Sequence, residues 1–237
     1  MIMRVELEGD QRIVEELTRE AFWNLYVPGA DEHFLIHNLR QQPEFVPELS
    51  LVAEIDGKIV GYIGYSLSTI ENANAVFQVL TFGPVSVLPS VQGKGVGSEL
   101  IKTSISKARS LGYKAIVIQG YPSYYRRFGF QNCSKFGICE EDGAFPKALQ
   151  VLELEVGALD GIRGKHVVSS VFETDQAALS VFDESFPKKE KFRTPSQKAF
   201  EIMSSLRHDD PEPDDIGMMS ICRDRLDDGS SGSPQPT

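Results

Sequence analysis

The hydrophobic positions of this chain change their period several times between residues 3 and 156, which predicts alternating strands and helices. Residues 3–7 alternate apolar and polar side chains, as a half-buried strand does, whereas residues 13–21 repeat apolar positions on one helical face. The dipeptide Asp56-Gly57 separates two β-rich runs and suits the positive φ angles of a type I′ hairpin turn. The full pattern predicts strands at residues 3–7, 50–55, 58–67, 76–88, 115–118 and 148–156, and helices at residues 13–21, 31–41, 100–111 and 123–128.

The order of these elements, βααβββαβαβ, predicts an α/β fold with a mixed sheet. Residues 76–88, the next helix and residues 115–118 form a strand-helix-strand unit, which makes a parallel crossover. Inside the first of these strands, Gly83-Pro84 predicts a bulge or a lost ladder bond, because proline has no N–H to donate. A central strand of the sheet is therefore expected to be broken locally.

The chain beyond the last of these strands predicts a helical extension. Phe182 and Phe186 fall on one face of its first helix, and we expect them to dock onto the main sheet. Its second helix follows Thr194, with Pro195 at the first helical position and Gln197 placed for a capping box. We expect helices at residues 175–186 and 196–206, a first domain over residues 1–156, a helical extension packed on it over residues 157–207, and a disordered acidic tail over residues 208–237.

The charge of the chain is concentrated at its end. The formal net charge is −10, and residues 208–237 hold eight acidic and two basic residues, so the rest of the chain is only mildly acidic. A protein that binds nucleic acid by neutralising phosphates needs clustered lysine and arginine, so that class is not expected. No apolar run approaches the length of a membrane span, and the N-terminus lacks the apolar segment of a secretory signal. We therefore expect a soluble, cytoplasmic protein without a membrane partner.

Neither the cysteines nor the histidines form a pattern that predicts a metal site or a disulfide framework. Cys133, Cys139 and Cys222 lack the paired short spacing of zinc ligands, so we expect free thiols. His33 and His37 stand four residues apart on a predicted helix, yet two ligands without a third are typical of solvated or capping groups. We therefore expect no bound metal.

The most specific motif is Gln92-Gly93-Lys94-Gly95-Val96-Gly97, which lies between the end of a strand and the start of a helix. Its glycines allow the backbone to turn several N–H groups in one direction, and the first helical turn adds unpaired donors, so a diphosphate could bind there. A nucleotide P-loop is excluded because Lys94 is followed by Gly95 rather than Ser or Thr. A Rossmann fingerprint is excluded because a single residue separates Gly95 from Gly97.

This loop and the segment Tyr125-Arg126-Arg127-Phe128-Gly129-Phe130 together resemble the GNAT superfamily of N-acetyltransferases, whose motifs are Q/R-x-x-G-x-G/A and Y-x-x-x-G-F. The resemblance covers residues 3–156 and implies a GNAT-like acyl-CoA N-acyltransferase fold with acetyl-CoA as co-substrate. It implies that backbone amides of residues 93–98 bind the CoA pyrophosphate and that the free backbone of Val85 and Val87 pairs with the pantetheine arm. The implied cofactor-binding residues are Val85, Ser86, Val87, Gln92, Gly93, Lys94, Gly95, Val96, Gly97 and Ser98.

The resemblance makes Tyr125 the first candidate for proton transfer. Acetyl transfer expels a CoA thiolate, and a phenol can donate a hydrogen bond or a proton to that sulfur as charge develops. Tyr125 could instead be an aromatic side chain that fills the space beside the parallel strands, and Tyr124 is the second candidate for the acid. Arg126 and Arg127 could meet the ribose phosphate of CoA or could be a solvated pair.

The base that accepts the amine proton has no assigned residue. Many family members carry a glutamate on the strand equivalent to residues 76–88, where this chain has no carboxylate. Water relayed from Glu32 or Glu71 is one alternative. The first two helices are expected to line the acceptor pocket, and their aromatic residues could form it or could simply pack in the core; these are Trp23, Tyr26 and Phe34.

Three classes of function remain open from the sequence. The first is an enzyme that moves an acetyl group from acetyl-CoA to a small-molecule amine or a peptide by direct attack in a ternary complex, because no cysteine falls inside the two motifs. The second is a catalytically silent acyl-CoA-binding or regulatory protein. The third is an interaction adaptor that uses the C-terminal helices and the acidic tail and binds no CoA.

Overall fold

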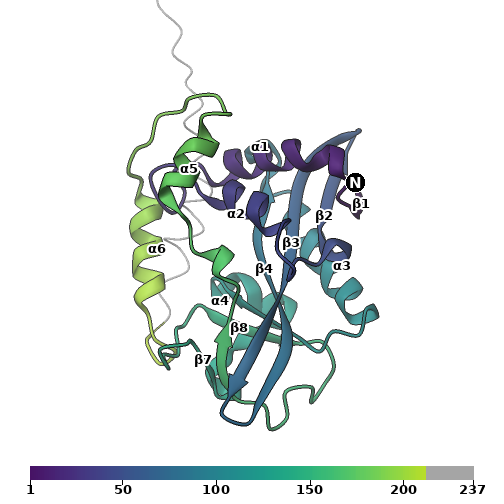
Figure 1. Ribbon diagram of the computed structural model, residues 1–237, viewed down its shortest axis with the longest axis vertical. Helices are drawn as coiled ribbons and strands as arrows, with labels where there is room; N and C mark the ends of the chain where they lie inside the picture. The colour runs from purple at the N-terminus through teal and green to yellow at the C-terminus, as the bar shows by residue number, and fades with distance from the viewer. Residues whose placement is uncertain (212–237) are drawn as a thin grey trace, which may run out of the picture.

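A long hairpin lies at the centre of the sheet in this computed structural model, which describes residues 1–211 (Figure 1). Its strands are β3 (Lys58–Asn72) and β4 (Ala75–Val87). At the turn before β3, Asp56 has a φ of 50° and Gly57 a φ of 75°, which confirms the predicted type I′ turn. The sheet order is β1-β2-β3-β4-β5-β8-β6, with β9 paired to β3 and β7 paired to β9. The other strands are β1 (Ile2–Val5), β2 (Leu51–Ile55), β5 (Ala115–Gln119), β6 (Gln131–Asn132), β7 (Ile138–Cys139), β8 (Leu149–Glu153) and β9 (Gly164–Val167).

Helices cover both faces of this sheet because its central strands alternate buried side chains between two apolar clusters. α1 (Gln11–Phe22) and α2 (Glu32–Leu39) cover the face on which Tyr62 is fully buried. Tyr65, three residues further along β3, points to the opposite face and packs against α3 (Val96–Ser110). The predicted mixed α/β order is confirmed, and β6, β7 and β9 are additions to it.

The bulge predicted at Gly83-Pro84 is confirmed by the register of the central hairpin. Ile63 pairs with Val85 and Tyr65 pairs with Phe82, so two residues of β4 face a single residue of β3. β4 runs parallel to β5, and their register pair is Leu80 with Ile116. The second half of β4 therefore leaves β5, and a gap opens between the two strands.

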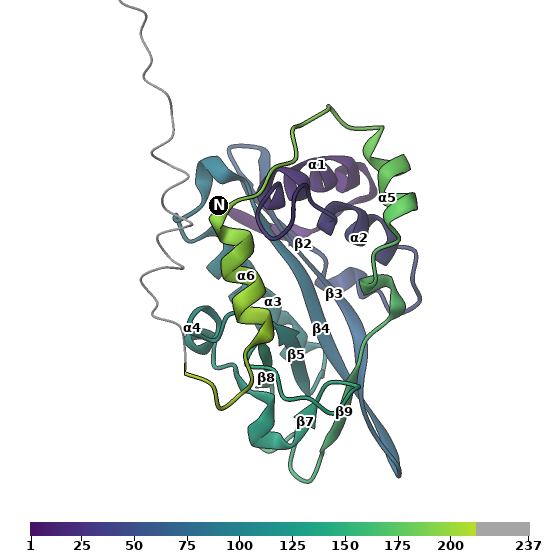
Figure 2. The same ribbon diagram turned by 90° about the vertical axis from the view of Figure 1, so that its left-hand side faces the viewer.

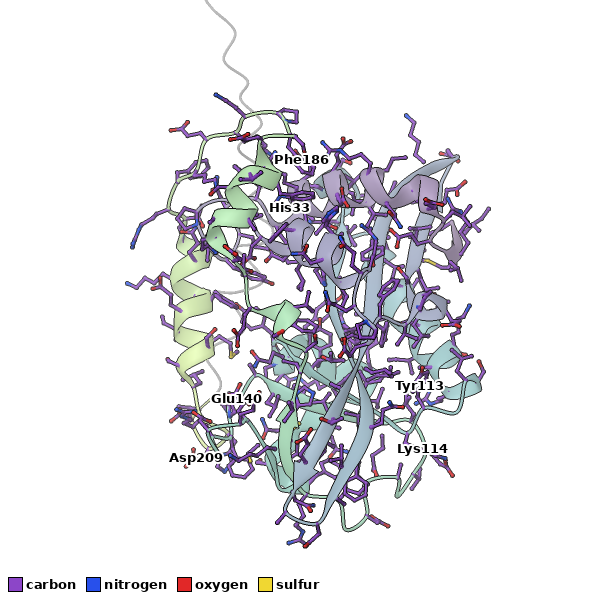
Figure 3. The ribbon with its side chains drawn as sticks, in the orientation of Figure 1. His33, Tyr113, Lys114, Glu140, Phe186 and Asp209 are labelled. Carbon is purple, nitrogen blue, oxygen red and sulfur yellow. The ribbon has the colours of Figure 1, made fainter. Side chains whose placement is uncertain are left out.

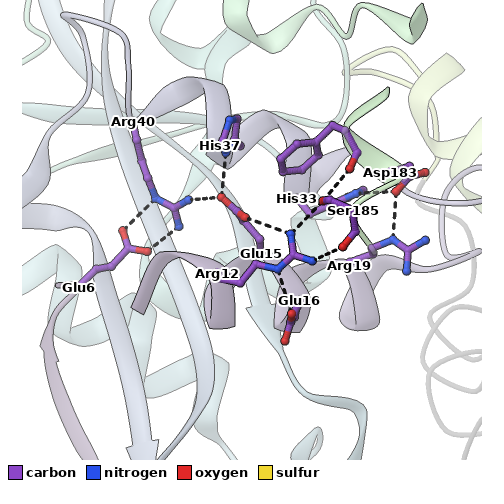
Figure 4. A network of polar contacts seen from close by, with 11 residues as sticks. Glu6, Arg12, Glu15, Glu16, Arg19, His33, His37, Arg40, Asp183 and Ser185 are labelled. Atoms are coloured by element: carbon purple, nitrogen blue, oxygen red, sulfur yellow. Dashed lines mark hydrogen bonds and ion pairs between the residues drawn. The ribbon is translucent and has the colours of Figure 1, made fainter. Parts of the chain in front are cut away.

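The C-terminal extension docks on α1 and α2 rather than on the sheet. α5 (Gln176–Asp183) ends at Asp183, whose Oδ1 accepts hydrogen bonds from Arg19 Nε at 3.1 Å and pairs with His33 Nε2 at 3.0 Å (Figure 4). The rings of Phe182 and Phe186 lie 5.6 and 5.1 Å from the His33 ring. The expectation that these phenylalanines pack on the main sheet is wrong. α5 packs on α1 and α2 instead, because Asp183 at its end pairs with the buried polar side chains Arg19 and His33.

The helix α6 (Pro195–Ser205) begins after Thr194 as predicted, but no capping box forms. The Thr194 hydroxyl donates to the Asn24 carbonyl at 2.9 Å, and Gln197 Nε2 donates to the same carbonyl at 3.2 Å. Both side chains therefore attach α6 to the connection between α1 and α2 instead of closing the helix end.

The described part of the expected acidic tail is short. His208 N donates to the Phe145 carbonyl at 2.9 Å, and Lys147 Nζ donates to the His208 carbonyl at 3.1 Å, so the boundary drawn at residue 207 is too early. Residues 212–237 of that predicted tail lie outside the described residues. Among residues 1–211, no helix has both the length and the apolar character that a membrane crossing requires.

Candidate functional site

The glycine loop lies at the start of α3, beside the gap between β4 and β5. Gly93 has a φ of 74° and Gly95, the residue before the helix, a φ of 87°, a region that side chains other than glycine disfavour. An added Cβ at either position would meet no atom within 4 Å. Gly97 is helical instead, and a Cβ there would lie 3.4 Å from the Tyr124 hydroxyl. Two of the three glycines therefore serve the turn, whereas a Cβ at Gly97 would be in ordinary contact with Tyr124.

The backbone amides of residues 93–98 are available to a ligand. Within the described chain they donate to no carbonyl or side chain, and Glu99 N is the first amide of α3 that bonds back, to Gly95 O at 3.0 Å. Gln92 Nε2 donates to the Val87 carbonyl at 2.9 Å, and Lys94 Nζ donates to the Ser90 carbonyl at 3.1 Å. These side chains brace the loop, while its amides and the positive end of α3 remain free for an anion.

The end of β4 turns backbone groups that do not pair with β3 toward the same gap, although the Val87 carbonyl already accepts the hydrogen bond from Gln92. Leu88 N donates to the Val60 carbonyl at 2.9 Å, so the alternation of an antiparallel ladder directs the N–H and C=O of Ser86 to β3. The backbone groups of Val85 and Val87 then point away from β3. Ser86 differs from its neighbours, since its hydroxyl is buried 2.8 Å from Thr18 Oγ1 on the α1 face.

The ring of Tyr125 lies where β5 ends and α4 (Pro122–Tyr125) begins. Its centroid is 5.9 Å from that of Phe82 on β4 and 5.6 Å from that of Phe130, so the ring packs between β4 and the segment just before β6. Burial raises its pKa well above the ordinary value, which keeps the phenol protonated. A Cβ on Gly120 would lie 2.2 Å from the Tyr125 ring, so the ring occupies the space that a side chain at Gly120 would fill. Gly120 was not among the site residues predicted from the sequence, where its position directly after a strand is the only indication of a role.

Tyr124 faces the loop rather than the interior. Its hydroxyl is the atom nearest to a Cβ built on Gly97, and the Arg127 guanidinium lies 3.9 Å from the centre of its ring. The rings of Tyr124 and Tyr125 meet edge to face with centroids 5.0 Å apart. The two candidate acids therefore lie side by side, and the Tyr124 hydroxyl is the one placed near the glycine loop.

The two carboxylates considered as relays for the base lie in different places. Glu71 lies on β3, seven residues beyond the residue that faces the bulge, and the rise of a strand makes this separation about 23 Å. Its carboxylate accepts a hydrogen bond from Thr69 Oγ1. Glu32 lies in the first turn of α2, and burial together with the charge of Asp31 raises its pKa to about 8.

The side chains of α1 and α2 that were candidates for metal binding or for the acceptor pocket instead hold the C-terminal extension. His33 is fully buried against α5, where Figure 3 places it beside Phe186, so the expectation of a solvated or capping histidine is wrong for it. Trp23 Nε1 donates to the Glu190 carbonyl at 2.9 Å, and Phe34 packs on Phe182. In the described chain no group of three potential metal ligands comes together.

α6 runs from the α1–α2 connection to residues 145–147 (Figure 2). At its start, Ser196 Oγ donates to the Leu25 carbonyl at 2.8 Å, and Phe200 stacks on Tyr26 with centroids 4.5 Å apart. At its end, Lys147 N donates to the Leu206 carbonyl at 2.9 Å. Residues 145–148 adjoin the end of β5, because Gly120 N donates to the Ala148 carbonyl at 2.9 Å.

Comparison with known proteins gives consistent matches. Residues 15–130 match the model of the acetyltransferase (GNAT) family. The uncharacterized N-acetyltransferase YhbS of Escherichia coli K12 is 30% identical over 166 residues, which are 69% of this chain and 93% of YhbS. The uncharacterized N-acetyltransferase YjhQ of the same organism is 34% identical over 100 residues, and the match spans only 55% of YjhQ.

Solved structures are similar over a comparable part of the chain. The crystal structure of E. coli YhbS in complex with CoA has a TM-score of 0.64 and 27% identity, and covers 73% of this chain and 92% of YhbS. A GNAT family acetyltransferase from Brucella melitensis in complex with acetyl-CoA has a TM-score of 0.59 and 29% identity, and covers 73% of this chain and 97% of that protein.

Proposed function

Because this chain belongs to the GNAT family of acetyltransferases, we propose that it transfers an acetyl group from acetyl-CoA to the amine of an acceptor by direct attack within a ternary complex. The observation that carries this proposal is the gap between β4 and β5. Free amides of the glycine loop, backbone groups of β4 that point away from β3, and the Tyr125 ring all border it.

In this proposal the glycine loop and β4 hold acetyl-CoA. The amides of residues 93–98 bind the pyrophosphate at the positive end of α3, with Gln92 and Lys94 bracing the loop. Val85 and Val87 offer backbone groups to the pantetheine arm. Ser86 supports the strand through Thr18 rather than contacting CoA.

The chemistry then needs an acid for the leaving thiolate. The amine nitrogen attacks the acetyl carbonyl carbon, the C–S bond breaks, and the Tyr125 phenol donates its hydrogen to the sulfur as charge develops. An acetylated cysteine has no support among the described thiols. Burial raises the pKa of the Cys133 thiol, and Cys139 lies on β7 with its thiol directed at the Gly164 carbonyl.

The position of α6 favours a small acceptor over a peptide. It crosses from the α1–α2 connection to residues 145–147, and its buried side, with Phe200 and Met203, faces the protein. An amine that approaches on this face must pass beside α6, which leaves less room for an extended chain.

The test is to incubate the protein with acetyl-CoA and a panel of amines, antibiotics and peptides while following thiol release and the mass of the products. We expect thiol release that depends on one class of amine, with a mass increase of one acetyl group on it. Tight acetyl-CoA binding without thiol release would support the silent acyl-CoA-binding alternative. No binding at all would support an adaptor.

A further inference from the structure

The first turn of α2 lies on the β4 side of the sheet, beside the end of α1. α1 and α2 run antiparallel, because Glu15 of α1 bonds to Arg40 just after α2, whereas Arg19 and His33 share one oxygen of Asp183 (Figure 4). The beginning of α2 therefore lies beside the end of α1.

The ends of the two helices are placed by their contacts with the sheet. Thr18, near the end of α1, contacts Ser86 of β4. Arg40, after the end of α2, pairs with Glu6 beyond β1, at the other edge of the sheet. α2 thus crosses the sheet from the β4 side to the β1 side, and its first turn lies on the β4 side.

Glu32 is on the side of α2 that faces the sheet. It precedes Ile36 by four residues and Leu39 by seven, which places all three on one face of the helix. Ile36 and Leu39 are almost fully buried, and Ile36 packs with Tyr62 on the floor of this face. One Glu32 oxygen accepts a hydrogen bond from Asp31 N at 3.2 Å, and the residue is only half-buried, so the carboxylate lies inside the protein without being sealed there.

The sheet itself offers hydroxyls but no carboxylate on this face near the bulge. Ser66 of β3 and Thr81 of β4 are register partners and are buried. Ser66 Oγ has no hydrogen-bond partner among the described residues, so a buried polar atom is left for a bound molecule. Hydroxyls can orient an amine, but they cannot hold its proton at neutral pH.

We propose that Glu32 is the general base of the transfer and that the acceptor is an aliphatic amine that arrives as its ammonium ion. This inference rests on the proposed function and adds the residue and the substrate class. The ammonium gives one proton to Glu32, and its nitrogen then forms the C–N bond as the C–S bond breaks. Glu32 passes this first proton to solvent before the attack and takes the second proton from nitrogen as the C–S bond breaks. Tyr125 gives its proton to the departing sulfur and regains one from solvent, so that the net reaction releases one proton.

The electrostatic surroundings suit this exchange. An aliphatic amine with a pKa near 10.4 is only about one part in a thousand neutral at pH 7, so it needs a base to accept its proton. Of the charged groups around the first turn of α2, Asp31 is the neighbour that raises the pKa of Glu32, together with burial. Arg19 and Asp183, from α1 and α5, pair with each other. An incoming cation lowers the cost of ionising Glu32 and takes the place of water around it.

The test compares Glu32→Gln with wild type on two acceptors, an aliphatic amine from the panel and an arylamine that is already neutral at pH 7. With the aliphatic amine at pH 7, we expect kcat/KM of the variant to fall about a hundredfold to ten-thousandfold, whereas the arylamine rate should change by no more than a few fold. Glu16→Gln is the matched control, because this carboxylate on α1 has a side chain 54% exposed.

The pH profile separates a base from a structural residue. In wild type, kcat/KM for the aliphatic amine should rise with pH and level off near the Glu32 pKa of about 8. In Glu32→Gln it should keep rising to the pKa of the amine. An unchanged aliphatic rate, or an equal loss with both acceptors, would overturn the assignment of Glu32 alone. Wild type that acetylates neither amine would overturn the proposed function, and the base with it.

Discussion

Gly120→Ala should displace the proposed acid without replacing any titratable residue. The new Cβ would lie 2.2 Å from Cε2 and 2.6 Å from Cδ2 of Tyr125, whereas ordinary contact begins at 3.4 Å. The difference, 3.4 − 2.2 = 1.2 Å, is the least that the ring or the end of β5 must move. A misplacement of about 1 Å in a catalytic group can reduce the rate about a hundredfold, equivalent to roughly 2.7 kcal/mol of transition-state stabilisation.

The assay is kcat from thiol release at saturating acetyl-CoA, with acetyl-CoA affinity measured by calorimetry and folding by thermal melting. We expect kcat to fall about a hundredfold while affinity changes little, because the glycine loop is untouched. Gly9→Ala is the control, since a Cβ there meets nothing within 4 Å and its φ is not positive. A folded Gly120→Ala protein that keeps kcat within about threefold of wild type would refute the placement of Tyr125 as the acid.

Three further predictions concern the loop, the extension and the effect of pH. Gly95→Val should weaken acetyl-CoA binding about tenfold or more, because backbone strain for valine at a φ of 87° is worth roughly 1–3 kcal/mol. Gly97→Val should have a smaller effect. Equal acetyl-CoA affinities of the two variants, measured by calorimetry, would contradict this prediction. Asp183→Ala should lower the free energy of unfolding by about 3–5 kcal/mol, because it leaves the nearly buried Arg19 unpaired, and denaturant titration would measure the loss. Burial lowers the pKa of His166 from 6.5 to about 4, so on acidification the unfolded chain binds a proton before the folded protein does. The free energy of unfolding should therefore fall by about 3 kcal/mol as the pH drops from 6.5 to 4. In melting experiments at a series of pH values, His166→Gln should reduce this loss.

The features predicted from sequence are those fixed by a few neighbouring residues. The Asp56-Gly57 turn and the bulge at Gly83-Pro84 each follow from the conformations that glycine and proline allow. The two GNAT motifs placed the glycine loop and Tyr125 on the correct elements, because each motif spans only a few residues and lies beside a well-patterned strand or helix.

The features that the sequence did not reveal depend on residues far apart in the chain. Asp183 pairs with Arg19 and His33, which lie more than 140 residues earlier in the chain, and no sequence pattern links the three residues. Thr194 fits a helix cap as well as a docking contact, and tertiary structure selects the second. Gly120 leaves the space that the Tyr125 ring occupies, and only the three-dimensional structure shows that the two residues meet.

The central claim is that the acetyl group leaves CoA beside Tyr125, and the turnover number of Tyr125→Phe tests it most directly. The substitution keeps the ring in its packing against Phe82 and removes only the proton donor. We predict that kcat falls about a hundredfold to ten-thousandfold with unchanged acetyl-CoA affinity, whereas Tyr124→Phe, measured beside it, loses much less. A Tyr125→Phe enzyme with wild-type kcat, under conditions where the chemical step limits the rate, would contradict the account.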